Sequence, residues 1–296
     1  MATCSDLSRT LGEPLHATAT FVTSWLLLED PGPWGRKALR ESGLDREVGE
    51  ELERRGKEAG VRVGLVRRFG RDRGSEARRV LVACSRPGSA FLELANVEDP
   101  RELLDLDLAC VAGGEPTGRG ELHPRPLYLV CTNGRRDPCC GRLGRDVARA
   151  LKHELRERLW ECSHVGGHRF APNLVALPHG LFFGRLDAGR APDVVAEVDA
   201  GRIPLECFRG RSSLPPAAQA ADAYVRGRDG VAGVDDVEVL EVAEAGEDES
   251  DVLVRAAGTD VRVRVRRRSL EPRPTSCGGR DEQPSSWEGV YSVSPR

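Results

Sequence analysis

Two stretches in the middle of the chain decide the fold: LYLVCTNGRRDPCCGRLG at 127–144 and LWECSHVGGHRFAPNLVALPHGLFFGRL at 159–186. Each opens with a short apolar run, which is typical of a buried strand. Between these runs, a polar loop over 132–141 leads into residues 142–159, where leucine and valine recur four residues apart. That spacing predicts an amphipathic helix.

The second stretch continues with a glycine-rich loop and then two short strands at 173–177 and 181–185, joined by a tight Pro-His-Gly turn. A helix is predicted at 193–200. The order strand, helix, strand, strand, strand, helix is that of a thioredoxin-like fold. Pro172 precedes a strand, as the cis-proline of thioredoxin folds does. We therefore predict an α/β, thioredoxin-like domain over residues 121–205.

The flanking regions predict two further parts. Residues 1–120 combine strand-like runs with a charged helix at 37–60, which indicates a mixed α/β N-terminal domain. It either packs against the central domain or forms a second, degenerate thioredoxin-like unit, although the sequence shows no internal repeat. Residues 206–296 predict a small β-rich C-terminal region, with a helix at 215–227, antiparallel strands and a tail rich in Pro, Gly and Ser.

Composition excludes several classes of protein. The chain has 296 residues, 39% hydrophobic and 31% charged, as expected of a soluble globular protein. Its longest apolar stretch, at 21–28, is far short of the ~20 residues of a membrane span. The first residues lack the basic and apolar regions of a secretory signal. The net charge of −3 argues against nucleic-acid binding. We expect a cytoplasmic protein with neither a nucleic-acid nor a membrane partner.

Cysteine usage is more informative. The count of nine is odd, and a reducing compartment argues against a disulfide scaffold. Three cysteines, Cys131, Cys139 and Cys140, fall within ten residues. Cys162 is expected to be a core thiol. The remaining cysteines are expected to be structural or incidental; they are Cys4, Cys84, Cys110, Cys207 and Cys277.

Two pairs of potential ligands stand out. Cys131 and Cys140 are separated by eight residues, and His164 and His168 by three. The loops that carry them leave the same ends of two predicted strands. If those strands are parallel neighbours, the four side chains meet at the carboxyl edge of the sheet, where α/β proteins bind ligands. Two thiolates and two imidazoles suit zinc or an iron–sulfur cluster. The wide cysteine loop favours the larger, two-metal group.

The two quoted stretches, together with EDPGPWG at 29–35, resemble the sucrase/ferredoxin-like family, whose signature includes SHxGGHRFAP. The resemblance implies a thioredoxin-like ferredoxin domain. It also implies a 2Fe–2S cluster of the kind that fungal members hold, with Cys131, Cys140, His164 and His168 as ligands. Two features depart from the family pattern. Asn133 stands where many relatives have histidine, and Cys139 beside Cys140 makes the second thiolate ambiguous.

These residues predict an electron carrier or redox sensor and not a stand-alone enzyme. Neutral imidazoles in place of thiolates raise the reduction potential of a cluster, and their N–H groups can couple reduction to proton uptake. Arginines near the ligands in sequence could form a positive rim for an acidic redox partner protein. They are Arg135, Arg136, Arg142, Arg145 and Arg169. No carboxylate pair suggests glycosidase chemistry.

Two other functions remain open from the sequence. A thiol–disulfide oxidoreductase could use Cys139 with Cys140, or Cys140 with Cys162, although no Cys-x-x-Cys follows the first strand. Alternatively, the ligands could hold zinc in a structural module that serves protein interaction.

Overall fold

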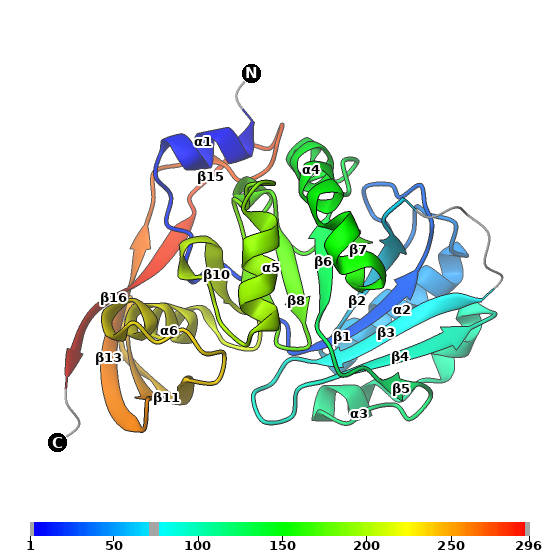
Figure 1. Cartoon of the computed structure of the whole chain (residues 1–296). Helices are drawn as coiled ribbons and strands as arrows, with labels where there is room; N and C mark the ends of the chain where they lie inside the picture. The colour runs from blue at the N-terminus through cyan, green and yellow to red at the C-terminus, as the bar shows by residue number, and fades with distance from the viewer. Residues whose placement is uncertain (1–2, 71–76, 294–296) are drawn as a thin grey trace.

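A mixed sheet of ten strands forms the centre of the molecule, with a separate four-stranded sheet at one end (Figure 1). The computed structural model describes residues 3–70 and 77–293. In the large sheet the strand order is β10-β9-β8-β6-β7-β2-β1-β3-β4-β5. Its strands are β1 (Ser24–Glu29), β2 (Val61–Arg68), β3 (Arg78–Cys84), β4 (Phe91–Val97), β5 (Glu121–Leu122), β6 (Leu127–Cys131), β7 (Leu159–Cys162), β8 (Leu174–Leu177), β9 (Leu181–Phe183) and β10 (Phe208–Arg211).

The second half of this sheet has the predicted thioredoxin-like arrangement. Strand β6 is parallel to β7 and antiparallel to β8, and β8 is antiparallel to β9. Helix α4 (Pro138–Leu155) connects β6 to β7, and α5 (Ala191–Asp199) follows β9. The Ala171–Pro172 peptide bond is cis, as expected. The predicted α/β fold with a thioredoxin-like central domain is therefore confirmed.

The first half of the sheet repeats this arrangement. Strand β1 is parallel to β2 and antiparallel to β3, which pairs antiparallel with β4. Helix α2 (Arg46–Ala59) connects β1 to β2. It begins nine residues later than predicted because Asp45, and not a residue near 37, accepts the first free N–H group, from Glu47 at 2.9 Å. The N-terminal block thus repeats the strand and helix order of the central domain, which is one of the two possibilities that the sequence left open.

The two halves join through their inner strands. Strands β2 and β7 pair antiparallel, and an ion pair between Arg67 Nε and Glu161 Oε2, 2.8 Å apart, crosses the junction. Alternate residues of the strands face opposite sides of the sheet. Leu26 and Leu28 belong to a core beneath α2, whereas Trp25 and Leu27 share another core with residues of the second half, among them Trp160. One continuous apolar core therefore links the halves.

The C-terminal region forms the separate sheet, as predicted, with one strand more than expected. Helix α6 (Pro216–Asp229) packs against strands ordered β11-β12-β13-β16. Their bounds are β11 (Val237–Gly246), β12 (Glu249–Ala256), β13 (Thr259–Ser269) and β16 (Ser285–Val293). Strand β16 follows the Pro-, Gly- and Ser-rich segment at 271–284, which was predicted as a tail or extended loop. Residues 294–296 lie outside the described residues. Strand β10 extends the large sheet beyond residue 205.

Short elements complete the chain. They are α1 (Cys4–Thr10), η1 (Pro100–Asp105), α3 (Leu108–Gly113), η2 (Arg156–Arg158), η3 (His168–Phe170), η4 (Leu205–Cys207), β14 (Arg273–Pro274) and β15 (Asp281–Glu282). Helix α1 lies beside the C-terminal segment that carries β15, close to the start of α4 (Figure 1). Among the helices of residues 3–70 and 77–293, none is long and apolar enough to cross a bilayer.

Candidate metal centre

Two buried cysteines end the neighbouring parallel strands β6 and β7. Cys131 is the last residue of β6 and Cys162 the last of β7, and they are paired in register. Both are at most 3% exposed and belong to the same apolar core. The carboxyl edge of a parallel pair is where the following loops bring their side chains together. The two loops that leave this edge carry the other predicted ligands.

The first loop is shorter than predicted because α4 begins at Pro138. Asp137 caps the helix by accepting the Cys139 N–H at 2.9 Å, and Pro138 occupies the first helical position, where no N–H is needed. Cys139 and Cys140 therefore lie in the first turn and not in a loop, and their side chains diverge. Cys140 Sγ is 3.6 Å from His168 Nδ1, whereas Cys139 Sγ is 3.2 Å from Cys277 Sγ.

The second loop brings the two histidines together. The rings of His164 and His168 stack with their centroids 4.6 Å apart, and both residues are half-buried. Between them, Gly166 and Gly167 have φ values of 91° and 72°, which favour glycine. A Cβ on Gly167 would lie only 2.3 Å from Nη2 of Arg209. The pair of glycines thus allows the turn that places one imidazole over the other.

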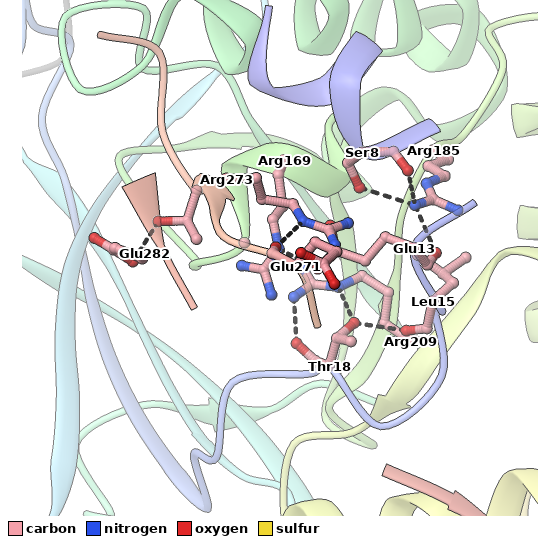
Figure 2. A network of polar contacts seen from close by, with 12 residues as sticks. Ser8, Glu13, Leu15, Thr18, Arg169, Arg185, Arg209, Glu271, Arg273 and Glu282 are labelled. Atoms are coloured by element: carbon pink, nitrogen blue, oxygen red, sulfur yellow. Dashed lines mark hydrogen bonds and ion pairs between the residues drawn. The ribbon is translucent and has the colours of Figure 1, made fainter. Parts of the chain in front are cut away.

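Arg209 supports this loop from below. Its side chain is 1% exposed, and its Nη1 donates to Gly166 O at 3.2 Å and to Asn173 Oδ1 at 2.8 Å. Its Nε donates to Thr18 Oγ1 at 3.1 Å, and Asn173 Nδ2 donates to Gly167 O at 3.0 Å. Figure 2 shows Arg209 reaching Thr18 of the N-terminal segment. The loop is therefore fixed through its own carbonyl groups.

The electrostatics of the site favour metal binding. Burial lowers the pKa of His168 to about 4, so its imidazole is neutral at pH 7, the form that binds metals. Contacts with the Cys140 and Cys162 side chains lower the pKa of Cys131 well below its usual value. The same contact with Cys131 raises the pKa of Cys140. The sulfurs of Cys131 and Cys140 therefore share one proton, and a metal that binds both sulfurs would displace this proton.

The four predicted ligands fit a 2Fe–2S cluster in donor chemistry. Cys140 contacts both Cys131 and His168, and His164 contacts Cys131. His164 Nδ1 is buried and has no hydrogen-bond partner among the described residues. An unpartnered buried nitrogen is costly unless something binds it. Two sulfurs and two nitrogens would complete such a cluster, with Cys131, Cys140, His164 and His168 as ligands.

The sequence did not predict a second cluster, because Cys4 and Cys277 were expected to be structural or incidental. Donor atoms of Cys4, Asp137, Cys139 and Cys277 all lie within 4.8 Å of one another. Cys4 and Cys277 are 273 positions apart, so no local spacing could have revealed the group. The capping sequence Asp-Pro, just before two cysteines, was the one available signal that both cysteines begin a helix.

Only some of the arginines predicted to form a positive rim are exposed and free to meet a partner protein. Arg135, Arg142 and Arg145 are exposed, but Arg169 pairs with the buried Glu13, with Nε and Oε1 2.6 Å apart (Figure 2). Further basic residues come from the first half of the chain. His164 lines a pocket of about 200 Å³ together with basic residues of the first half, namely Arg36, Lys37, Arg40 and Arg62. Arg136 of the predicted rim lines the same pocket.

Known proteins are similar in sequence to parts of this chain. The sucrase/ferredoxin-like family model matches residues 15–210. The "Altered inheritance of mitochondria protein 32" of Eremothecium gossypii is 30% identical over 120 residues, which cover 36% of this chain and 38% of that protein. Its Debaryomyces hansenii counterpart is 30% identical over 97 residues, which cover 29% and 36% of the two chains. The chain thus spans little more than a third of these relatives.

Among solved structures, a variant of the thioredoxin-like 2Fe–2S ferredoxin of Aquifex aeolicus is similar to part of the chain. The match has a TM-score of 0.26 and 16% identity, and it covers 28% of this chain and 96% of the ferredoxin. The family model, by contrast, covers about two thirds of the 296 residues, including both thioredoxin-like halves and all four predicted ligands. The chain belongs to the sucrase/ferredoxin-like family.

Proposed function

We propose that this protein transfers or senses electrons through a 2Fe–2S cluster held by Cys131, Cys140, His164 and His168. The observation that carries the proposal is the convergence of these side chains, with Cys140 Sγ 3.6 Å from His168 Nδ1 and the buried Nδ1 of His164 left unpartnered. When bound, the cluster would supply one-electron redox chemistry. The chain's own residues would hold the cluster, set its surroundings and present it to a partner.

The surroundings suit such a role in two ways. The cysteine sulfurs are buried in the core, which protects them from solvent, while His164 and His168 are half-buried and His164 lines a surface pocket. Electrons would therefore enter and leave on the histidine side. The buried guanidinium of Arg209 supplies a positive charge close to Cys140 and Cys131. A fixed positive charge at this depth stabilises added negative charge at the site.

An acidic protein is the partner that the exposed surface favours. Arg135, Arg142 and Arg145 lie in or after the first ligand loop, and Arg36 and Lys37 add positive charge beside His164. Positive charge around the half-buried His164 and His168 would steer an acidic partner towards these two residues. Arg169 takes no part, because Glu13 neutralises it. We further propose a reducing compartment such as the cytoplasm, since all nine cysteines are free.

The oxidoreductase alternative has less support. The sulfurs of Cys139 and Cys140 point to different partners, Cys277 and His168. A disulfide between these neighbours would need both side chains to leave their present contacts. Cys162 lies beside Cys131 at the strand ends, and its pKa is raised by burial, which disfavours a reactive thiolate.

Iron and sulfide analysis of matched variants tests the proposal. We expect about two iron and two sulfide ions per chain in anaerobically purified protein, with visible absorption that bleaches on reduction. Cys131→Ser should lose most of the iron, because it removes a ligand. The control is Cys162→Ser, which changes an equally buried cysteine at the end of the adjacent strand and should retain the cluster. A native cluster spectrum in both His164→Ala and His168→Ala would refute the ligand assignment.

A further inference from the structure

We propose that Cys4, Asp137, Cys139 and Cys277 form a second, separate metal site that binds zinc. The three sulfurs form a compact triangle. Cys139 Sγ is 3.2 Å from Cys277 Sγ and 3.6 Å from Cys4 Sγ, and the remaining side, between Cys4 and Cys277, is 3.6 Å. The Asp137 oxygens lie 3.8 and 3.9 Å from Cys4 Sγ.

These separations suit donors that share one small ion. Zinc holds cysteine sulfur at about 2.3 Å in a tetrahedron, which places two sulfurs roughly 3.8 Å apart. Two of the observed separations, at 3.6 Å, are about 0.2 Å shorter than this tetrahedral value, and the third, at 3.2 Å, is about 0.6 Å shorter. They are far longer than the roughly 2.05 Å bond of a disulfide, and all three cysteines are free. Three thiolates with one carboxylate oxygen is a donor set that zinc accepts.

The charge at the site points to a missing cation. Asp137 is 1% exposed, and no basic side chain forms an ion pair with it within residues 3–70 and 77–293. Its oxygens accept N–H groups from Cys139 and from Cys277, each at 2.9 Å, and their remaining contact is the Cys4 thiol at 3.8 and 3.9 Å, whose proton a metal would displace. A buried carboxylate next to three sulfurs is unfavourable without a positive partner. Each carboxylate oxygen still has a second lone pair for a metal.

The proposed zinc would join three distant parts of the chain. Cys4 lies in the first turn of α1, Cys139 in the first turn of α4, and Cys277 between β14 and β15. Figure 1 shows α1 and the segment with β15 together near the start of α4. All four donors come from the protein, which is typical of a structural zinc site.

Metal analysis with a cysteine pair removed tests this site. We expect about one zinc per chain in the purified protein. In Cys4→Ser/Cys277→Ser the zinc content should fall at least about tenfold, because two of four ligands are lost. Iron content should stay unchanged, which separates this site from the proposed cluster. Cys207→Ser is the matched control: it is half-buried like Cys277, and its sulfur donates a hydrogen bond to Pro204 O at 3.8 Å.

Zinc X-ray absorption of the wild-type protein identifies the ligands without relying on a variant. We expect about three sulfur neighbours at ~2.3 Å and no imidazole scattering. A zinc chelator should also make α1 and the segment around Cys277 newly sensitive to limited proteolysis. Protein isolated with no zinc, or with zinc that the double variant retains and the His164→Ala variant loses, would overturn the proposal.

Discussion

The two thioredoxin-like halves share one topology and differ in the residues that their loops carry. In the second half, β6 and β7 end in cysteines and lead into loops that contain the proposed ligands. In the first half, β1 leads into DPGPWGRKALRESGLD at 30–45 and β2 into FGRDRGSEA at 69–77, and neither stretch contains cysteine or histidine. Of these four stretches, only the two in the second half thus present cysteines and histidines.

The two halves share their strands and helices and differ in the loops at the strand ends, so we expect these loops to determine the function. Strand pairing and helix placement need only apolar strands and capped helices, which both halves have. Ligand chemistry needs particular residues in the loops at strand ends, where proteins with a common fold differ most. The first half contributes in another way. It shares an apolar core with the second half, and it supplies basic side chains such as Arg36 and Lys37 to the pocket that His164 lines.

The largest expected loss of stability comes from removing Arg209, which holds the loop that carries His164 and His168. Arg209→Ala removes four hydrogen bonds and leaves the carbonyls of Gly166 and Thr18 without this donor. We expect the free energy of unfolding to fall by about 3–5 kcal/mol and the iron content to drop, because each unmet buried group is costly. Chemical denaturation and iron analysis measure both. Exposed Arg135→Ala should change neither, and an equal effect of the two substitutions would contradict the role of Arg209.

A pair of glycines sharpens the comparison between the halves. Gly60, after α2, and Gly167, between the histidines, have nearly the same φ, 73° and 72°, but only Gly167 has atoms in the way of a Cβ. Gly60→Ala should cost about 1 kcal/mol of unfolding free energy from backbone strain alone. Gly167→Ala should cost about 3 kcal/mol, because overpacking against Arg209 adds to that strain, and should lower iron binding. Equal costs would show that the loop is loosely packed.

Replacing a histidine ligand by cysteine should preserve the cluster and alter its potential. His164→Cys exchanges a neutral ligand for an anionic one, which stabilises the oxidised form. We expect the reduction potential to fall by about 100 mV or more in a spectroscopic redox titration. His153→Cys changes an exposed histidine on α4 and serves as the control. Identical potentials for both variants and the wild type would remove His164 from the ligand set.

The smallest loss of stability is expected at Asp199, the last residue of α5, which is not among the proposed ligands. Burial alone would raise the pKa of Asp199, but hydrogen bonds from Arg158 and Tyr128 outweigh it and the pKa is lowered. The stabilisation is therefore present above the unfolded pKa, near 3.9, and is lost as pH falls through the lower folded value.

Asp199→Asn tests that prediction. At pH 7 the variant should lose no more than about 1 kcal/mol, since solvent screens the pair, and the loss should vanish in acid. Iron content should be unchanged. Asp193→Asn, on the exposed side of α5, is the control for denaturation curves taken across pH. A loss that persists in acid would mean that packing, and not the carboxylate charge, is responsible.

Part of the fold could be predicted from the sequence because some of its signals are local. The apolar run at 127–131 and the SHVGGHRFAP motif are such signals, so the strand and the loop could be predicted, whereas the four proposed ligands stay a prediction. The first half has the same topology but only generic apolar patterns, which do not distinguish one α/β unit from another. The second cluster depends on Cys4 meeting Cys277, a contact that only the assembled tertiary structure creates.

The central claim is that the second half alone holds a 2Fe–2S cluster through two sulfurs and two histidine nitrogens. Pulsed electron paramagnetic resonance of the reduced protein, with nitrogen-15 placed only in histidine, tests it most directly. We predict strong couplings from two imidazole nitrogens, reduced to one in either His164→Cys or His168→Cys. A cluster signal without histidine nitrogen couplings, or no cluster in anaerobically purified protein, would contradict the account.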